Sequence, residues 1–286
     1  MIKTLKTARI PITLLLILVI VSVILTSLCA CANRNKAYIF NTTDGNIAEG
    51  ISDEIEFLNK REKKASMPET KQITFDGKTY DTVYDESIYS PYYNCDYDAY
   101  EYSGDGVGIS FDLDSKTGEI VGWARYLRNS TRELTPEEMN ESDERLAIAK
   151  KFVEENTTGE YELTWDNGNA NVKTKSEGIL HTFFFNKRIS GLLTADKICV
   201  TVNSLGEICS YKKNMIMDGV SELKIDAERS RKVAEKRLEK ITDENTEYEI
   251  LSEYVTRLRN GNFGTEYNVR VTKNGLSSIF KMFVYN

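Results

Sequence analysis

The stretch with the most unusual composition runs from Tyr80 to Gly106 and reads "YDTVYDESIYSPYYNCDYDAYEYSGDG". It holds eight of the chain's 16 tyrosines, interleaved with aspartate and glutamate. Clustered carboxylates and backbone carbonyls can bind calcium, and tyrosines offer an apolar ring and a hydroxyl to a peptide or a carbohydrate. Because tyrosine is also a good strand former, the same composition is typical of a solvated acidic sheet surface with half-buried tyrosines.

Spacing within this region helps to separate the three interpretations. The segment "DLDSKTGEI", from Asp112 to Ile120, places Gly118 one position late for an EF-hand loop and has no glutamate at the twelfth position. The spacing therefore disfavours a metal site, and we expect no cofactor. If the region is a partner-binding surface, its acids favour a basic protein or peptide. The residues expected to contact that partner are Tyr92, Tyr93, Asp96, Tyr97, Asp98, Tyr100 and Glu101.

Hydrolytic chemistry has little support in the sequence. His181 is the only histidine, and it lies within "GILHTFFF" on an expected strand, where we expect a packed or edge-exposed side chain. The sequence has no His-Glu-x-x-His, no Gly-x-Ser-x-Gly and no phosphate-binding loop. Carboxylates are abundant, so an exported hydrolase that uses a carboxylate pair is the alternative hypothesis, but no spacing selects a pair. We expect no catalytic residue.

The first 32 residues have the pattern of an export signal. Three basic residues precede a run without charge from Ile10 to Ala32. The end of this run, Leu28-Cys29-Ala30-Cys31, resembles the bacterial lipobox, which predicts removal of residues 1–30 and lipid attachment at Cys31. An uncleaved anchor remains an alternative, because the run could span a bilayer of roughly 30 Å, and so does an ordinary secreted protein. All three place most of the chain outside the cytoplasm, and the first places it on the cell membrane.

Charge and cysteine content limit the partners and the scaffold. The chain carries a net charge of −7, and loss of the signal would make it more acidic, which disfavours nucleic acid and anionic lipid headgroups as partners. Few cysteines follow the signal, so disulfides do not build the fold. A three-residue hairpin loop would place Thr201 opposite Cys209 and leave Cys199 one diagonal step away. Two thiols are therefore favoured over a disulfide.

The hydrophobic pattern predicts an α+β fold made of tandem small units, each with one helix packed on an antiparallel sheet. Residues 31–70 are polar and predict a tether, with a short helix near Ser52 to Lys64. Two amphipathic segments predict helices at 143–156, with Ser142 as the cap, and at 227–241, with Asp226 as the cap. Alternating segments joined by turns predict strands at 72–76, 79–84, 98–103, 107–113, 119–127, 161–165, 170–175, 179–187, 196–202, 207–213, 247–259, 265–273 and 277–285. The expected units are 71–131, which is β-rich, 135–213 and 218–286.

The segments "ERLAIAKKFVEENTTG" and "HTFFFNKRISGLLTADKICVTVNSLGEICSYKK" resemble the PepSY-like domains of exported bacterial proteins. In those domains a helix precedes a small sheet that ends in a hairpin with an Asp or Asn, turn residues, Gly, a charged residue and an apolar residue. Asn203 to Ile208 fits this hairpin, and Asp114 to Ile120 fits it with one extra turn residue. The resemblance implies a non-catalytic module that restrains a peptidase or binds within the cell envelope.

The same pattern predicts which strands are exposed. A helix covers one face of a sheet, so the other face and any edge strand remain available to a partner. The run from Thr182 to Phe185 is apolar on both faces and predicts a central strand. The 80–119 region and the last strand, "IFKMFVYN", are the expected edges, and the 80–119 region is the expected docking surface for a protein or peptide of the envelope.

Overall fold

The computed structural model describes residues 37–42, 60–89, 96–104, 106–127, 134–135, 141–166, 173–174, 178–257 and 261–286. Strands account for 59% of the described part and helices for 15%. The strands are β1 (Ala37–Thr42), β2 (Lys60–Glu62), β3 (Thr70–Phe75), β4 (Lys78–Tyr89), β5 (Asp96–Gly104), β6 (Val107–Asp114), β7 (Ile120–Leu127), β8 (Glu160–Asp166), β9 (Lys173–Thr174), β10 (Gly178–Ile179), β11 (His181–Ile189), β12 (Leu192–Val202), β13 (Ile208–Asn214), β14 (Thr246–Arg257), β15 (Phe263–Lys273) and β16 (Leu276–Tyr285). The described helices are α2 (Ser142–Asn156) and α3 (Ala227–Ile241).

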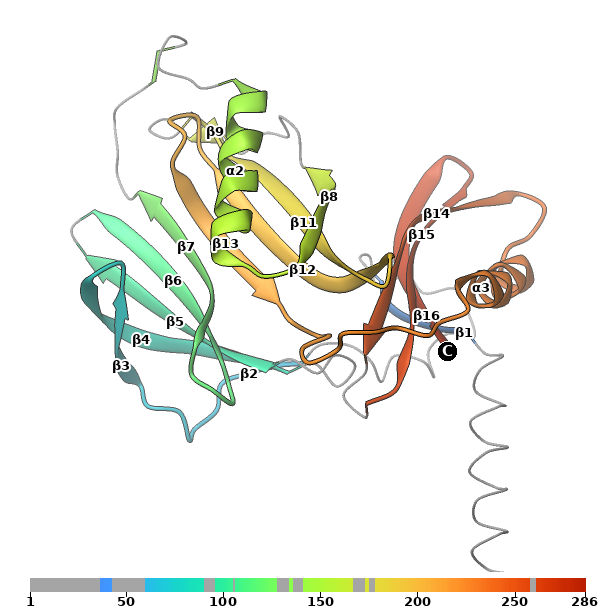
Figure 1. Cartoon of the computed structure of the whole chain (residues 1–286), viewed down its shortest axis with the longest axis horizontal. Helices are drawn as coiled ribbons and strands as arrows, with labels where there is room; N and C mark the ends of the chain where they lie inside the picture. Colours follow the sequence, from blue (N-terminus) through green and yellow to red (C-terminus); the bar gives the residue numbers. More distant parts are fainter. Residues whose placement is uncertain are drawn as a thin grey trace, which may run out of the picture.

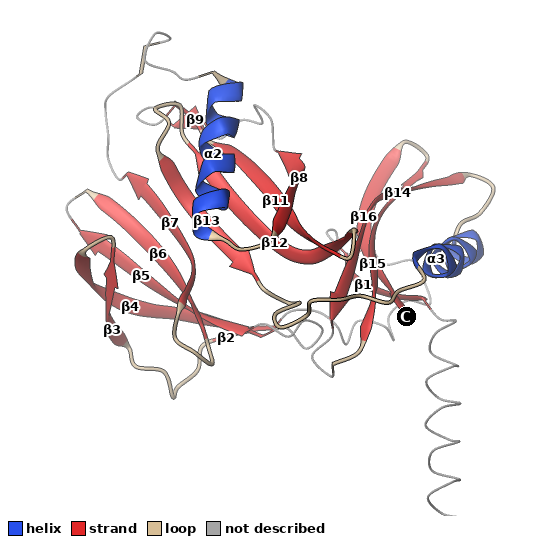
Figure 2. Ribbon diagram, viewed as in Figure 1, coloured by secondary structure: helices blue, strands red, loops and turns tan. Residues whose placement is uncertain are grey.

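The expected fold of tandem helix-on-sheet units is wrong, because one mixed sheet dominates the structure (Figures 1 and 2). Fourteen strands are hydrogen-bonded in this sheet, along the path β1-β16-β15-β14-β12-β13-β7-β6-β5-β4-β2 with β3, β8 and β11 beside it. Two contacts join segments that the sequence predicted as separate units. Strand β13 pairs with β7 in antiparallel orientation, and β12 pairs with β14 in parallel at Thr194 and Val255.

Strands β3 to β7 form a region whose core comes from its own side chains. Alternation along the strands places Tyr84, Tyr100, Phe111 and similar residues on one face, where they are buried. The aromatic rings contact one another, with Phe75 and Phe111 at 5.6 Å between centroids and Tyr80 and Phe111 at 5.8 Å. Large aromatic side chains therefore supply the apolar area that a packed helix would otherwise provide.

Helix α2 lies where the sequence predicts it, but its cap differs. Glu141, not Ser142, is the N-cap, and its side chain forms a capping box with Glu144 that satisfies backbone N–H groups of the first turn. Ala149 and Val153 are buried against β11 and β12, in a cluster that includes Phe183. The amphipathic character predicted for this helix is confirmed.

Helix α3 has the predicted bounds and the predicted cap. The Asp226 carboxylate accepts a hydrogen bond of 2.9 Å from the Arg229 backbone N–H. Ala234 and Leu238 are fully buried against β15 and β16, where Tyr267 and Met282 are also buried. This packing covers one face of β14 to β16, and residues of the other face line a cavity together with residues of β8, β11 and β12.

Three expectations about the ends and edges are corrected. Strand β16 is not an edge, because it pairs with β15 on one side and with β1 on the other. Strand β1 lies within the segment expected to be a tether, and β2 is a strand where the end of a helix was expected. The central position of the Thr182–Phe185 run is confirmed, since β11 pairs with both β8 and β12.

Strands β12 and β13 form the hairpin predicted at Asn203 to Ile208. Asn203 is fully buried, and its side-chain oxygen accepts the N–H groups of Leu205 at 3.0 Å and Glu207 at 2.9 Å. Gly206 has a φ of 79°, which is the left-handed region that glycine adopts without strain. In the matching turn after β6, Asp114 accepts the N–H groups of Lys116 and Thr117, both at 2.8 Å.

Replacing Asn203 by alanine is expected to cost about 1–3 kcal/mol of unfolding free energy, because two backbone donors in a buried turn lose their acceptor. Asn203→Asp keeps the acceptor but loses the amide that donates to the Glu207 carboxylate at 3.1 Å, so it should also be less stable than wild type. Urea denaturation of the two variants and wild type measures the effect. Equal stability of wild type and Asn203→Ala would show that the side chain does not hold the turn.

Candidate functional site

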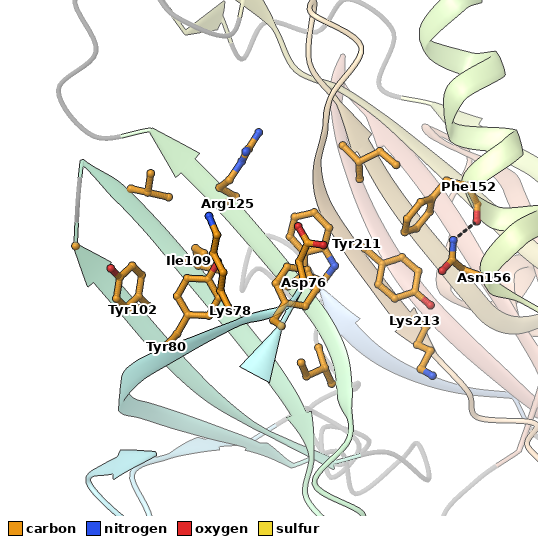
Figure 3. Close-up of a pocket in the computed structure, with 16 residues that line it drawn as sticks. Asp76, Lys78, Tyr80, Tyr102, Ile109, Arg125, Phe152, Asn156, Tyr211 and Lys213 are labelled. Carbon is orange, nitrogen blue, oxygen red and sulfur yellow. Dashed lines mark hydrogen bonds between the residues drawn. The ribbon is translucent and has the colours of Figure 1, made fainter. Parts of the chain in front are cut away.

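A large cavity lies on the face of the sheet that carries α2, beside that helix. It has a volume of about 760 Å³, and Figure 3 shows the side chains that line it. We call it the aromatic groove. Its lining consists of Phe75, Asp76, Lys78, Tyr80, Tyr102, Gly104, Val107, Ile109, Ile120, Trp123, Arg125, Phe152, Asn156, Ile208, Tyr211 and Lys213.

Pairing between β13 and β7 creates the groove. Tyr211 on β13 is the partner of Trp123 on β7, so the two sheet regions share one face at this junction. Phe152 of α2 contacts Tyr211 at 5.4 Å between ring centroids, and Trp123 contacts Phe75 at 5.0 Å. Helix α2 and the aromatic face of β3 to β7 thus form the two walls, as Figure 3 shows for Phe152 and Tyr102.

Cationic side chains lie along the groove. Arg125 pairs with exposed Glu207 at 3.0 Å. Lys78 and Lys213 have no acidic partner within 4.0 Å in the described part of the chain. Asp76 is the one carboxylate among the described lining residues. The groove therefore combines aromatic contact area with positive charge, and it would accept an apolar ligand that carries acidic groups.

The described residues among those predicted to contact a partner do not all lie on one exposed surface. Asp98 and Tyr100 are buried at 5% and 0% exposure, so their assignment to a docking surface is wrong. Asp98 accepts hydrogen bonds from Ser87 and from Lys64, and Tyr100 packs against Tyr84 at 5.5 Å. Burial raises the pKa of Tyr100, and the nearby Asp98 carboxylate adds to the increase.

Other members of the predicted surface lie elsewhere. Tyr92 and Tyr93 lie outside the described residues. Tyr97 is on the face of β5 opposite Tyr100, where the ammonium group of Lys212 lies 3.9 Å from its ring centroid. Asp96 is half-buried, and Glu101 is exposed. The 80–119 region is also not an edge, because β5 pairs with β4 and β6.

The His181 side chain is packed inside the protein, which is one of the two outcomes expected from the sequence. Its ring is 3% exposed and lies 4.0 Å from the ring of Phe183. Nε2 lies 3.3 Å from the Asp166 carboxylate and Nδ1 lies 3.4 Å from the Ser142 hydroxyl. This line of hydroxyl, imidazole and carboxylate does not line the aromatic groove, and it connects the start of α2 to β11 and β8.

Cys199 and Cys209 are not joined by a disulfide. The expected pairing of Thr201 with Cys209 is wrong, because a bulge places Thr201 opposite Ser210 and Val202 opposite Ile208. Burial raises the pKa of the Cys199 thiol. The structure therefore gives neither cysteine the environment of a reactive thiolate.

The described residues contain no group of three His, Cys, Asp or Glu side chains that could hold a metal ion. Within the same part of the chain, none of the helices is long and apolar enough to cross a membrane. The apolar run at 10–32 and Cys31 lie outside the described residues, so their roles stay predictions.

Comparison with known proteins yields one structural likeness. No protein family model and no curated protein matches the chain. The Bacillus megaterium YpeB C-terminal domain aligns with 83% of this chain and 85% of its own chain, at 11% sequence identity and a TM-score of 0.35. A likeness at this level supports no argument about function, so the site must be interpreted from its own residues.

The sequence did not identify the residues that line the groove on the α2 side. Phe152 lies in the segment predicted as an amphipathic helix, Tyr211 and Trp123 lie in predicted strands, and nothing in the sequence pattern marks any of the three as a binding residue. The alternation of side chains along the strands was the one available signal. It places Tyr80 and Tyr102, which come from the tyrosine-rich stretch, on the same face of the sheet as Trp123. No local pattern, however, predicts that β7 pairs with β13.

Proposed function

We propose that this protein is a non-catalytic binding protein of the cell envelope, anchored by lipid at Cys31 on the outer face of the cytoplasmic membrane. The aromatic groove carries the proposal, because it is lined by rings and large enough for a peptide segment. One carboxylate among its described lining residues offers no pair for acid–base hydrolysis. The resemblance of 135–213 to PepSY-like domains favours restraint of a peptidase as the biological form of this binding.

The partner proposed here differs in charge from the basic one expected from the sequence. Lys78, Arg125 and Lys213 outnumber Asp76 among the charged residues of the groove. An extended segment with aromatic and acidic side chains matches this lining, since rings stack on rings and carboxylates approach the ammonium groups. We therefore propose an acidic, apolar segment of an envelope protein as the ligand.

Affinity capture from envelope extract with the full chain in detergent tests the function. The double variant Lys78→Glu with Lys213→Glu is expected to recover about tenfold less of the specific partner than wild type, because both changes place negative charge against an acidic ligand. The control is Lys116→Glu with Lys224→Glu, which makes the same charge change on exposed residues outside the groove. Equal recovery by both double variants, or no specific recovery by wild type, would contradict the proposal.

Replacement of Cys31 by alanine is expected to abolish incorporation of labelled fatty acid and to leave the signal uncleaved, because the thiol is the proposed acceptor. Cys29→Ala should be labelled like wild type. Metabolic labelling followed by gel analysis of the full chain gives the result. Labelling of Cys31→Ala at the wild-type level would exclude this site of anchoring.

A further inference from the structure

A second cleft lies between the two sheet faces that no described helix covers. We call it the sheet cleft. On one side are β8, β11, β12 and β13, whose opposite face packs against α2, and on the other are β14, β15 and β16, whose opposite face packs against α3 (Figure 1). The parallel pairing of Thr194 with Val255 joins the two walls. The volume of the cleft is about 430 Å³.

Exposed apolar side chains gather in this cleft. Trp165 is 56% exposed, and Leu251 and Ile279 are each 38% exposed, although all three are large and hydrophobic. Phe184 lies beside Trp165 at 4.8 Å between ring centroids. Three exposed apolar residues that converge from both walls on one concave site are typical of a binding surface.

A single lysine lacks a counter-charge there. Lys197 lies 5.3 Å from the ring centroid of Phe184, and no acidic group lies within 4.0 Å of its ammonium group in the described structure. Its two basic neighbours are paired, Lys281 with buried Glu266 at 2.5 Å and Lys212 with Asp112 at 2.7 Å. Burial and these neighbours lower the pKa of Lys197, so an added carboxylate would relieve an unfavourable environment.

Polar groups on the walls favour a peptide over a fatty acid. Thr164 donates a hydrogen bond of 2.7 Å to the buried amide of Asn186, and Asn268 donates one of 2.7 Å to Ser252. Half-buried hydroxyl and amide groups of this kind can form hydrogen bonds with a peptide backbone. A hydrocarbon tail would exclude water from these groups and offer no hydrogen bond in return. The apolar residues would then contact side chains that flank the acid.

We propose that the sheet cleft is a second binding site, distinct from the aromatic groove, for a short peptide segment in which an acidic residue lies beside large apolar residues. The acidic side chain pairs with Lys197, and the apolar side chains contact Trp165, Leu251 and the ring of Phe184. This site does not depend on the function proposed for the groove, because the two cavities share no lining residue.

The chain's two tryptophans allow a direct test, because Trp123 lines the aromatic groove and Trp165 lines the sheet cleft. The full chain in detergent, with Trp123→Phe, is titrated with acetyl-Leu-Glu-Phe-amide and with acetyl-Leu-Gln-Phe-amide while Trp165 fluorescence is recorded. We expect a saturable change with about tenfold higher affinity for the glutamate peptide, and we expect Lys197→Met to remove that preference. Lys224→Met, at an exposed lysine, should keep it.

Two further measurements keep a folding defect from being mistaken for a binding defect. The first compares the thermal unfolding midpoint of Lys197→Met with that of its parent. The second uses Leu251→Ser, at an exposed position, which should lower the affinity for both peptides to the same extent. Equal affinity for the two peptides, a preference retained in Lys197→Met, or a signal seen only from Trp123 in a Trp165→Phe variant would overturn the proposal. Lys197-dependent binding of dodecanoate in place of the peptides would assign the cleft to a lipid acid and overturn it as well.

Discussion

Replacement of Asp196 by asparagine is expected to stabilise the protein at neutral pH. Asp196 on β12 is fully buried, its Oδ1 accepts the Met217 N–H at 2.7 Å, and its Oδ2 has no hydrogen-bond partner. Burial raises its pKa from 3.8 to about 6. A buried carboxylate with one unsatisfied oxygen is costly when it is charged, and a neutral amide avoids that cost.

The sign of the pH dependence follows from the raised pKa. The folded state binds the proton more tightly than the unfolded state, so the stabilisation from protonated Asp196 is complete below about pH 4 and is lost as pH rises through about 6. The difference in pKa corresponds to at most about 3 kcal/mol. Hydrogen bonds from Lys273 and Thr246 lower the pKa of Asp243 to about 2. Asp243 therefore contributes stability that is lost only as pH falls below about 4, which is the opposite pH dependence to that of Asp196.

Urea denaturation of wild type and Asp196→Asn at pH 4, 5, 6 and 7 measures this effect. The variant should show a flatter profile across this range and exceed wild type by about 1–3 kcal/mol at pH 7. Glu222→Gln removes an exposed carboxylate and should keep the wild-type profile. A variant that is less stable than wild type at pH 7 would show that the charged form is needed in the fold.

Replacement of Phe111 by alanine is expected to cost about 3–5 kcal/mol of unfolding free energy, because the ring is fully buried in the core of β3 to β7. Phe111 contacts Phe75 and Tyr80, which line the aromatic groove, so recovery of the proposed partner should fall as well.

Two matched variants isolate this effect. Phe111→Leu keeps most of the volume and should cost less, and Val83→Ala, at a side chain that is 52% exposed, should stay within about 0.5 kcal/mol of wild type. Chemical denaturation of all three gives the comparison. A loss below about 1 kcal/mol for Phe111→Ala would mean that these strands do not depend on an aromatic core.

Local patterns predicted the local structure well. The bounds of α3, the cap at Asp226 and the turn at Asn203 each depend on a few neighbouring residues, and the structure confirms all three. The cap of α2 differed by one residue because Glu141 and Glu144 satisfy each other's backbone groups, which competes with a serine cap.

Long-range strand pairing explains what the sequence did not predict. The pairing of β7 with β13 and of β12 with β14 joins segments far apart in the chain, so no local pattern separates one extended sheet from tandem units. Strand parity also decides which tyrosines are exposed: Tyr100 faces the core and Tyr97 the opposite side. Composition alone could not make that distinction, and for that reason the buried residues Asp98 and Tyr100 were wrongly assigned to the predicted surface.

The most direct test of the proposed function is site-specific photocrosslinking in cells that make the full chain. A benzophenone amino acid replaces Tyr102, which lines the aromatic groove, or Tyr126, which is exposed on β7 and does not line it. We expect a discrete covalent adduct from position 102, lost when Lys78→Glu and Lys213→Glu are added, and none from position 126. No adduct from position 102, or the same adduct from both positions, would contradict the assignment of the groove as a binding site.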